Sequence, residues 1–227
     1  MLIIKYIYNY ILYMCWNENV SLNTFLFSSF VLVLIIYNNS FTKYKIQELN
    51  NKWIYLFFAS FITMQLIEFF IWRNINNKFY NNIFSIFAIL LLLIQPIASI
   101  MIVTNIQIRN LLLLSYLLFT IPYSIYKFST NHIHSTISEG GHLIWNFFGT
   151  HPIIGIGWLF FFLFSFVYEK KWILFIFGLL TLLIAFINYK NDNSIWSMWC
   201  WSVNSIMIYY AIYLLLYLPF LEKMSIC

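Results

Sequence analysis

The sequence predicts an all-α integral membrane bundle of about seven transmembrane helices, preceded by an N-terminal interfacial segment. The first observation behind this prediction is composition: 63% of the 227 residues are hydrophobic, 8% are charged, and the mean hydropathy is +0.82. Soluble domains carry roughly 25% charged residues, so this composition excludes a water-soluble globule. The second observation is the recurrence of apolar runs close to the roughly 20 residues that a helix needs to cross a bilayer.

The first 13 residues are expected to lie outside the transmembrane domain, which is assigned to residues 14–227. The apolar stretch at residues 1–15 is interrupted by Lys5 and Asn9 and is too short to span a bilayer. No small-residue cleavage site follows it, which argues against a cleaved signal peptide. We interpret it as an interfacial segment, or as an extension upstream of a start at Met14.

Seven spans are expected, at about residues 22–37, 53–72, 83–103, 111–126, 152–167, 172–187 and 197–220. Asn17, Asn19 or Ser21 is expected to cap the start of the first span. Pro96, which follows Gln95 in the third span, is expected to kink that helix because proline removes a backbone donor and crowds the preceding turn. The longest connection, residues 127–150, is expected to be a loop.

The distribution of basic residues predicts an orientation. In a seven-span chain the N-terminal side carries five Lys and Arg residues and the opposite side carries seven. Because basic residues concentrate on the cytosolic side, the N-terminus is expected outside or in the lumen and the C-terminus in the cytosol. The acceptor sequon at Asn38 would then face the cytosol without a glycan, so a glycan on Asn38 would reverse the orientation.

The second span carries two polar side chains, Gln65 and Glu68, which are three residues apart and therefore share one helix face. An ionisable side chain at membrane depth is costly and normally faces a bundle interior or a water-filled cavity. We therefore expect the bundle to enclose a small polar site that opens to the N-terminal side. Such a site suits binding or passage of a small polar solute or ion, as in a transporter, channel or receptor.

Four further residues are assigned to this candidate site. Gln95 of the third span and Asn204 of the seventh are expected to line it, and Trp199 and Trp201 are expected to form its mouth. In an alternative interpretation, Glu68 is a packing clasp between spans and the protein has a purely structural role.

A membrane-embedded, metal-dependent hydrolase is a second alternative, in which the connection at residues 127–150 supplies the ligands. His132, His134, Glu139 and His142 would then fold over the bundle mouth and bind zinc. The spacing of the first two matches no helical HExxH arrangement, and a solvated polar loop is the simpler explanation.

Tryptophans near the span ends are expected to be interfacial belt residues that anchor the helices. This interpretation applies to Trp53, Trp72, Trp145, Trp158 and Trp172.

The sequence excludes one class of membrane protein and disfavours another. No lysine lies within residues 197–220 or inside any other predicted span, which excludes a retinal Schiff base. The segment at residues 15–18, with Cys15, Trp16 and Glu18, resembles the Trp-Cys-Glu segment of alkaline ceramidases. However, the second, third and seventh spans lack the histidines, and every span lacks the aspartate, that hold zinc in those enzymes. No cofactor is therefore expected. No run of basic residues indicates a nucleic-acid partner, and the lipid bilayer is the expected partner.

Four short blocks together resemble an uncharacterised family of multi-pass membrane proteins found chiefly in large DNA viruses. They are Met14–Asn17 with Val20-Ser21, Met64–Glu68, Gln95-Pro96 and Met198–Trp201. The resemblance covers most of the chain, from Met14 to Asn204. It implies a viral membrane protein of the host-cell or virion membrane, whose common core begins at Met14. It implies no activity, ligand or catalytic residue.

Overall fold

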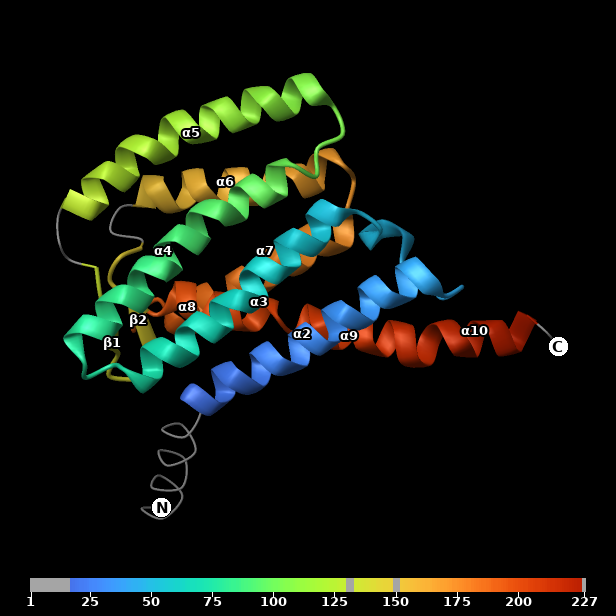
Figure 1. Cartoon of the computed structure of the whole chain (residues 1–227), viewed down its shortest axis with the longest axis horizontal. Helices are drawn as coiled ribbons and strands as arrows, with labels where there is room; N and C mark the ends of the chain where they lie inside the picture. The colour runs from blue at the N-terminus through green and yellow to red at the C-terminus, as the bar shows by residue number, and fades with distance from the viewer. Residues whose placement is uncertain (1–16, 130–132, 149–151, 226–227) are drawn as a thin grey trace, which may run out of the picture.

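The computed structural model describes residues 17–129, 133–148 and 152–225, which are largely helical (Figure 1). The predicted interfacial segment at residues 1–13 lies outside the described residues. The first helices are α2 (Glu18–Phe41), α3 (Lys52–Arg73), α4 (Lys78–Ile100), α5 (Ile106–Ser129), α6 (Pro152–Tyr168) and α7 (Trp172–Tyr189). The last part of the chain consists of α8 (Ile195–Val203), α9 (Ile206–Ile212), the π-helical turn η2 (Tyr213–Tyr217) and α10 (Leu218–Ser225). Three short elements lie in the connections: η1 (Gln47–Leu49), β1 (Ser135–Ile137) and β2 (Leu143–Trp145).

The prediction of an all-α core is confirmed. Six helical segments are long and apolar enough to cross a membrane: α2, α3, α4, α5, α7 and the composite segment at residues 195–221. α6 has 17 residues and is shorter, at the lower end of the range of about 17–25 residues that span a bilayer. The fold therefore has the long apolar helices of a membrane-embedded protein.

Asparagine side chains set the starts of three long helices. The Asn17 side chain accepts hydrogen bonds from two N–H groups of the first turn of α2, so this helix begins at Glu18 rather than near residue 22. Asn51 and Asn77 cap α3 and α4 in the same way. A side-chain oxygen at this position satisfies backbone donors that have no partner within the helix.

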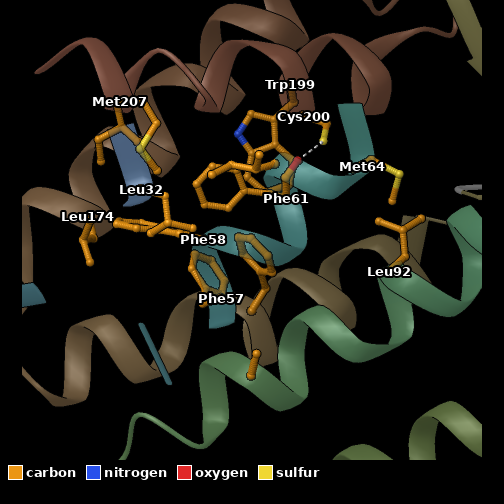
Figure 2. Packing of buried hydrophobic residues seen from close by; sticks show 14 of the residues in the cluster. Leu32, Phe57, Phe58, Phe61, Met64, Leu92, Leu174, Trp199, Cys200 and Met207 are labelled. Carbon is orange, nitrogen blue, oxygen red and sulfur yellow. Dashed lines mark hydrogen bonds between the residues drawn. The ribbon is translucent and has the colours of Figure 1, made fainter. Parts of the chain in front are cut away.

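α3 lies at the centre of the bundle, between α2 and α4 (Figure 1). α4 also packs on α5 and α6, α7 packs on α8, and α2 packs on α9. Along α3 the aromatic rings of Phe57, Phe58 and Phe61 form the middle of the core (Figure 2). Phe57 packs on Phe162 of α6 at a centroid distance of 4.8 Å, and Phe58 packs on Tyr210 of α9 at 6.0 Å.

Two of the tryptophans expected in an interfacial belt lie in this core instead. The side chains of Trp145 and Trp158 are each 4% exposed. Trp158 stacks on Phe162 at 4.6 Å and meets the Trp199 ring edge-on at 6.0 Å. The belt interpretation is therefore wrong for Trp145 and Trp158, because both rings fill space between elements that the sequence does not place side by side.

Pro96 leaves one carbonyl of α4 without its helical donor, and side chains from two other helices bond to this region. Proline has no N–H group, so the carbonyl of Leu92, four residues earlier, loses its partner. The indole N–H of Trp158 in α6 donates to the Leu92 oxygen at 2.8 Å. The Tyr116 hydroxyl in α5 donates to the next carbonyl, that of Leu93, also at 2.8 Å. The region around Pro96 is thus bonded to both α5 and α6.

We expect Trp158→Phe to lower the free energy of unfolding in detergent micelles by about 1–3 kcal/mol, because the Leu92 carbonyl loses its donor. Adding Pro96→Ala restores a backbone N–H at the position that bonds Leu92. The double variant should therefore recover part of the loss, whereas the packing defect of the smaller ring would persist. Strictly additive effects of the two substitutions would contradict this account.

The predicted seventh span is broken into α8 and α9. Between them, Asn204 and Ser205 form a turn. The Asn204 amide donates to the Cys200 carbonyl at 2.9 Å, and the hydroxyls of Ser202 and Ser205 donate to carbonyls three residues earlier. These side chains compete with backbone N–H groups for the helical acceptors, which favours a break. The predicted seventh span is thus present at residues 195–221, with a turn at Asn204 and Ser205 inside it.

The predicted loop at residues 127–150 is also corrected. Its first three residues belong to α5, and residues 133–148 contain an antiparallel β-hairpin, β1–β2, in which Ile137 pairs with Leu143. Gly141 adopts a φ of 81° in the turn, and a Cβ on Gly140 would collide with the Asp192 carboxylate. We refer to residues 133–148 as the cap hairpin.

The side chain of Asn81, at the start of α4, bonds to the cap hairpin in the way that the backbone of a neighbouring strand would. Its side-chain amide donates to the Ser135 carbonyl at 3.0 Å, and its oxygen accepts from the Ser135 N–H at 2.9 Å. The Asn82 amide donates to the Ile133 carbonyl at 2.6 Å. From the other side, the Ser197 hydroxyl of α8 donates to the Leu143 carbonyl. The hairpin is thus fixed to α4 and α8.

Candidate functional site

Gln65 and Glu68 lie inside the bundle on one face of α3, as their spacing predicts. The Gln65 amide donates to Glu68 Oε2 at 2.8 Å. Gln65 has no exposed surface and Glu68 is 3% exposed, so neither side chain faces lipid. The polar face of the second span is therefore an interior feature.

Each of these two side chains retains a buried oxygen without a hydrogen-bond donor: Gln65 Oε1 and Glu68 Oε1. The groups that act on the Glu68 carboxylate are the Gln65 amide and the Trp145 indole, and no basic side chain among the described residues compensates it. The Trp145 N–H lies beside the carboxylate but outside hydrogen-bond geometry. A buried acceptor without a donor normally has a water, a proton or an ion as its partner.

Cys200 brings α8 to this pair. Its sulfur lies 3.8 Å from the Gln65 amide nitrogen and 3.9 Å from the Phe61 carbonyl oxygen, the contact drawn in Figure 2. α8 ends three residues later, at Val203, and the buried Asn204 side-chain oxygen also lacks a donor. The end of α8 therefore lies next to the acid–amide pair, and the Asn204 amide takes the place of a backbone donor at the Cys200 carbonyl.

A cavity of about 20 Å³ lies beside Cys200, and its lining includes Gln95, Trp145 and Trp199 but neither Gln65 nor Glu68. This volume is enough for about one water molecule. Gln95 thus lies near the predicted site through Cys200, with which it lines this cavity. The space is far smaller than the roughly 300–1,000 Å³ of an organic-ligand pocket.

Trp199 does not stand at a mouth in this structure. It is buried, and its indole N–H donates to the Gly178 carbonyl and the Thr181 hydroxyl of α7. Trp201 is partly buried and donates to the Thr24 hydroxyl of α2 at 3.0 Å. Both rings therefore join α8 to other helices.

The cap hairpin covers the side on which an opening was expected. Trp145 from β2, together with Phe147 and Phe148, is buried against the bundle. Phe148 meets the rings of Trp158 and Trp196 edge-on at 5.5 and 5.0 Å. The prediction of a site open to the N-terminal side is thus corrected to a closed site with an aromatic cap.

The proposed metal ligands are dispersed. His134 and Glu139 are exposed on the cap hairpin, and His132 lies outside the described residues. His142 packs edge-on against Tyr189 at 4.9 Å, and its partial burial lowers the pKa of the imidazole while the nearby Asp192 raises it. Across residues 17–129, 133–148 and 152–225, no group of three potential ligands is close enough to hold a metal ion.

Trp145 and Asn81 are the site residues that sequence reasoning missed. The hairpin that carries Trp145 had a recognisable signal, since Gly140-Gly141 lies between two short runs that contain β-branched residues, Thr136-Ile137 and Ile144. No sequence signal pointed to Asn81, because an asparagine in the first turn of a helix usually forms hydrogen bonds within that helix alone.

Comparison of the chain with family models, curated proteins and solved structures returns no match.

Proposed function

We propose that this chain is a multi-pass membrane protein with seven spans, α6 included, that binds or passes a proton or a small dehydrated cation at Glu68 and Gln65. The observation that carries the proposal is the pair of donor-free oxygens, Gln65 Oε1 and Glu68 Oε1, in a buried site without a compensating base among the described residues. A proton on Glu68, or one cation between the two oxygens, would satisfy both.

Two further features support a small cation over a larger solute. The small cavity lined by Gln95 and Cys200 has room for about one water molecule. The break after α8 places the carbonyl end of a short helix near Cys200, and transporters use such half-helix ends to bind sodium ions or protons at membrane depth. The cap hairpin would then control access from the N-terminal side.

The viral resemblance is compatible with this proposal. Three of its four blocks converge in space, because Gln65, Gln95 and Cys200, one from each block, surround the same small cavity or touch its lining. We therefore infer that the shared sequence serves this interior site, in a viral protein whose N-terminus is outside and whose C-terminus is cytosolic.

Glu68→Gln is expected to abolish cation-dependent proton exchange. Purified protein in vesicles of phosphatidylcholine and phosphatidylglycerol, loaded with a pH-sensitive dye, should show a pH change when a sodium or potassium gradient is imposed. Glutamine keeps the hydrogen bond with Gln65 but cannot titrate or bind a cation as a carboxylate does. Direct proton counting on the purified protein should show one titrating group fewer in Glu68→Gln.

Glu139→Gln is the matched control, because Glu139 is an exposed acid on the cap hairpin of the same side. It should leave exchange unchanged. If Glu68→Gln folds and has the same proton count and exchange as the original protein, Glu68 is a structural clasp and the proposal fails.

A further inference from the structure

A second cavity opens on the flank of the bundle between α6, α7 and α8. Its volume is about 570 Å³, and it is lined by one glycine and otherwise by Leu, Ile, Phe and Trp side chains, among them Leu159, Leu182 and Phe186. This volume lies within the range of roughly 300–1,000 Å³ that is typical of pockets for organic ligands. We call it the flank groove.

The shape of the flank groove depends on Gly155 and Trp196. A Cβ at Gly155 would come within 2.9 Å of the Trp196 ring, so any larger residue would displace the ring that forms part of the groove wall. Trp196 also lines the small interior cavity beside Cys200. One aromatic ring therefore lies between the groove and this small cavity.

The surroundings of the groove are those of a lipid-facing surface. Ile153 on α6, and Ile184 and Ile187 on α7, are exposed apolar side chains close in sequence to the lining residues. In a bilayer, covering an apolar groove with a second apolar helix gains little free energy, because the lipid tails are as apolar as the helix. A flexible hydrocarbon chain can therefore fill such a groove in place of a second helix.

One end of the groove carries a positive charge. The Lys190 ammonium lies 5.8 Å from the centroid of the Phe186 ring, and Phe186 lines the groove. Lys190 follows the last residue of α7, so a bilayer spanned by α7 would end near this ammonium. A lysine ammonium is a common partner of phosphate.

We propose that the flank groove binds one acyl chain of an anionic phospholipid, with the chain along Leu159 and Leu182 and the phosphate beside Lys190. The site selects its ligand by two features together: an apolar channel of fixed width beside Gly155 and Trp196, and a cation at the water-facing end. This inference depends on membrane insertion but not on cation binding at Glu68.

Quenching of Trp196 fluorescence by brominated acyl chains tests the proposal. The protein is reconstituted in phosphatidylcholine vesicles that contain a small fraction of brominated phosphatidylglycerol, or the same fraction of brominated phosphatidylcholine. The Trp196 signal is obtained as the difference between the original protein and Trp196→Phe. We expect several-fold stronger quenching of this signal by the anionic lipid.

Two variants test the cationic end and the apolar lining of the groove separately. Lys190→Gln should remove the preference for the anionic lipid. Leu183→Phe should reduce quenching by both lipids, because Leu183 lines the groove and, at 54% exposed, leaves room for the larger ring. Equal quenching by both lipids, unchanged in Leu183→Phe, would show bulk lipid only and overturn the proposal. An unquenched Trp196, with cross-links between copies through the groove, would instead assign the surface to a second copy of the chain.

Discussion

Trp145→Ala is expected to open the interior site and make Cys200 reactive toward water-soluble thiol reagents. Trp145 is 4% exposed, lies beside the Glu68 carboxylate and lines the small cavity together with Cys200. Removing the indole leaves a void between the cap hairpin and α3 that connects this cavity to the outside. The loss of a large buried ring should also lower the free energy of unfolding by about 3–5 kcal/mol.

The rate of Cys200 modification by a charged methanethiosulfonate measures this opening. Cys15→Ser and Cys227→Ser are introduced first, so that Cys200 is the remaining thiol of the three in the chain. Trp172→Ala is a suitable control, because Trp172 is 51% exposed at the opposite end of the bundle. A modification rate that is equal in Trp145→Ala and in the parent, with the fold intact by size exclusion, would show that the cap does not control access.

Asn81→Ala is expected to release the cap hairpin from α4 while leaving the rings of the core in place. Its buried side chain exchanges two hydrogen bonds with the Ser135 backbone, accepts one from the Ser85 hydroxyl and donates one to the Ile75 carbonyl. Truncation leaves several buried polar groups without partners. The expected loss of stability is on the order of 3 kcal/mol, since each such group costs about 1–3 kcal/mol.

Amide hydrogen exchange of residues 133–148 reports this release directly. Exchange in Asn81→Ala should be faster across the cap hairpin and unchanged in α7. Asn82→Ala is the matched control, because the neighbouring amide makes one bond to the hairpin and is only partly buried. Asn81→Asp keeps the acceptor for the Ser135 N–H and loses the donor, so its effect should be intermediate. If Asn82→Ala has the larger effect, Asn81 does not hold the hairpin.

Both predictions concern access to the proposed cation site. If Glu68 exchanges protons with water, a site covered by Trp145, Phe147 and Phe148 requires a conformational change of the cap hairpin. Variants that loosen the hairpin should therefore speed exchange in the vesicle assay, and they should have no effect in a Glu68→Gln background. Such a dependence on Glu68 would show that the cap hairpin controls access to this acid. It would also show that the faster exchange does not come from general instability of the protein.

The features that depend on near neighbours along the chain could be predicted from the residues alone. Apolar runs predicted the long helices, and Asn17 was among the residues expected to cap the first of them. The pairing of Gln65 with Glu68 follows from the three-residue spacing on a helix, and the structure gives it as a bond of 2.8 Å. Burial of the pair followed from the cost of exposing an acid to hydrocarbon.

Which apolar surface faces the interior depends on contacts between helices that are distant in the sequence. Trp145 and Trp158 looked like interfacial anchors, but both are core residues that meet partners far away in the sequence. The bond from Trp158 to Leu92 depends on α6 lying against the part of α4 that Pro96 leaves without a donor. The physical reason is general: the lipid-facing and core-facing sides of a membrane helix are equally apolar, so hydrophobicity alone does not distinguish them.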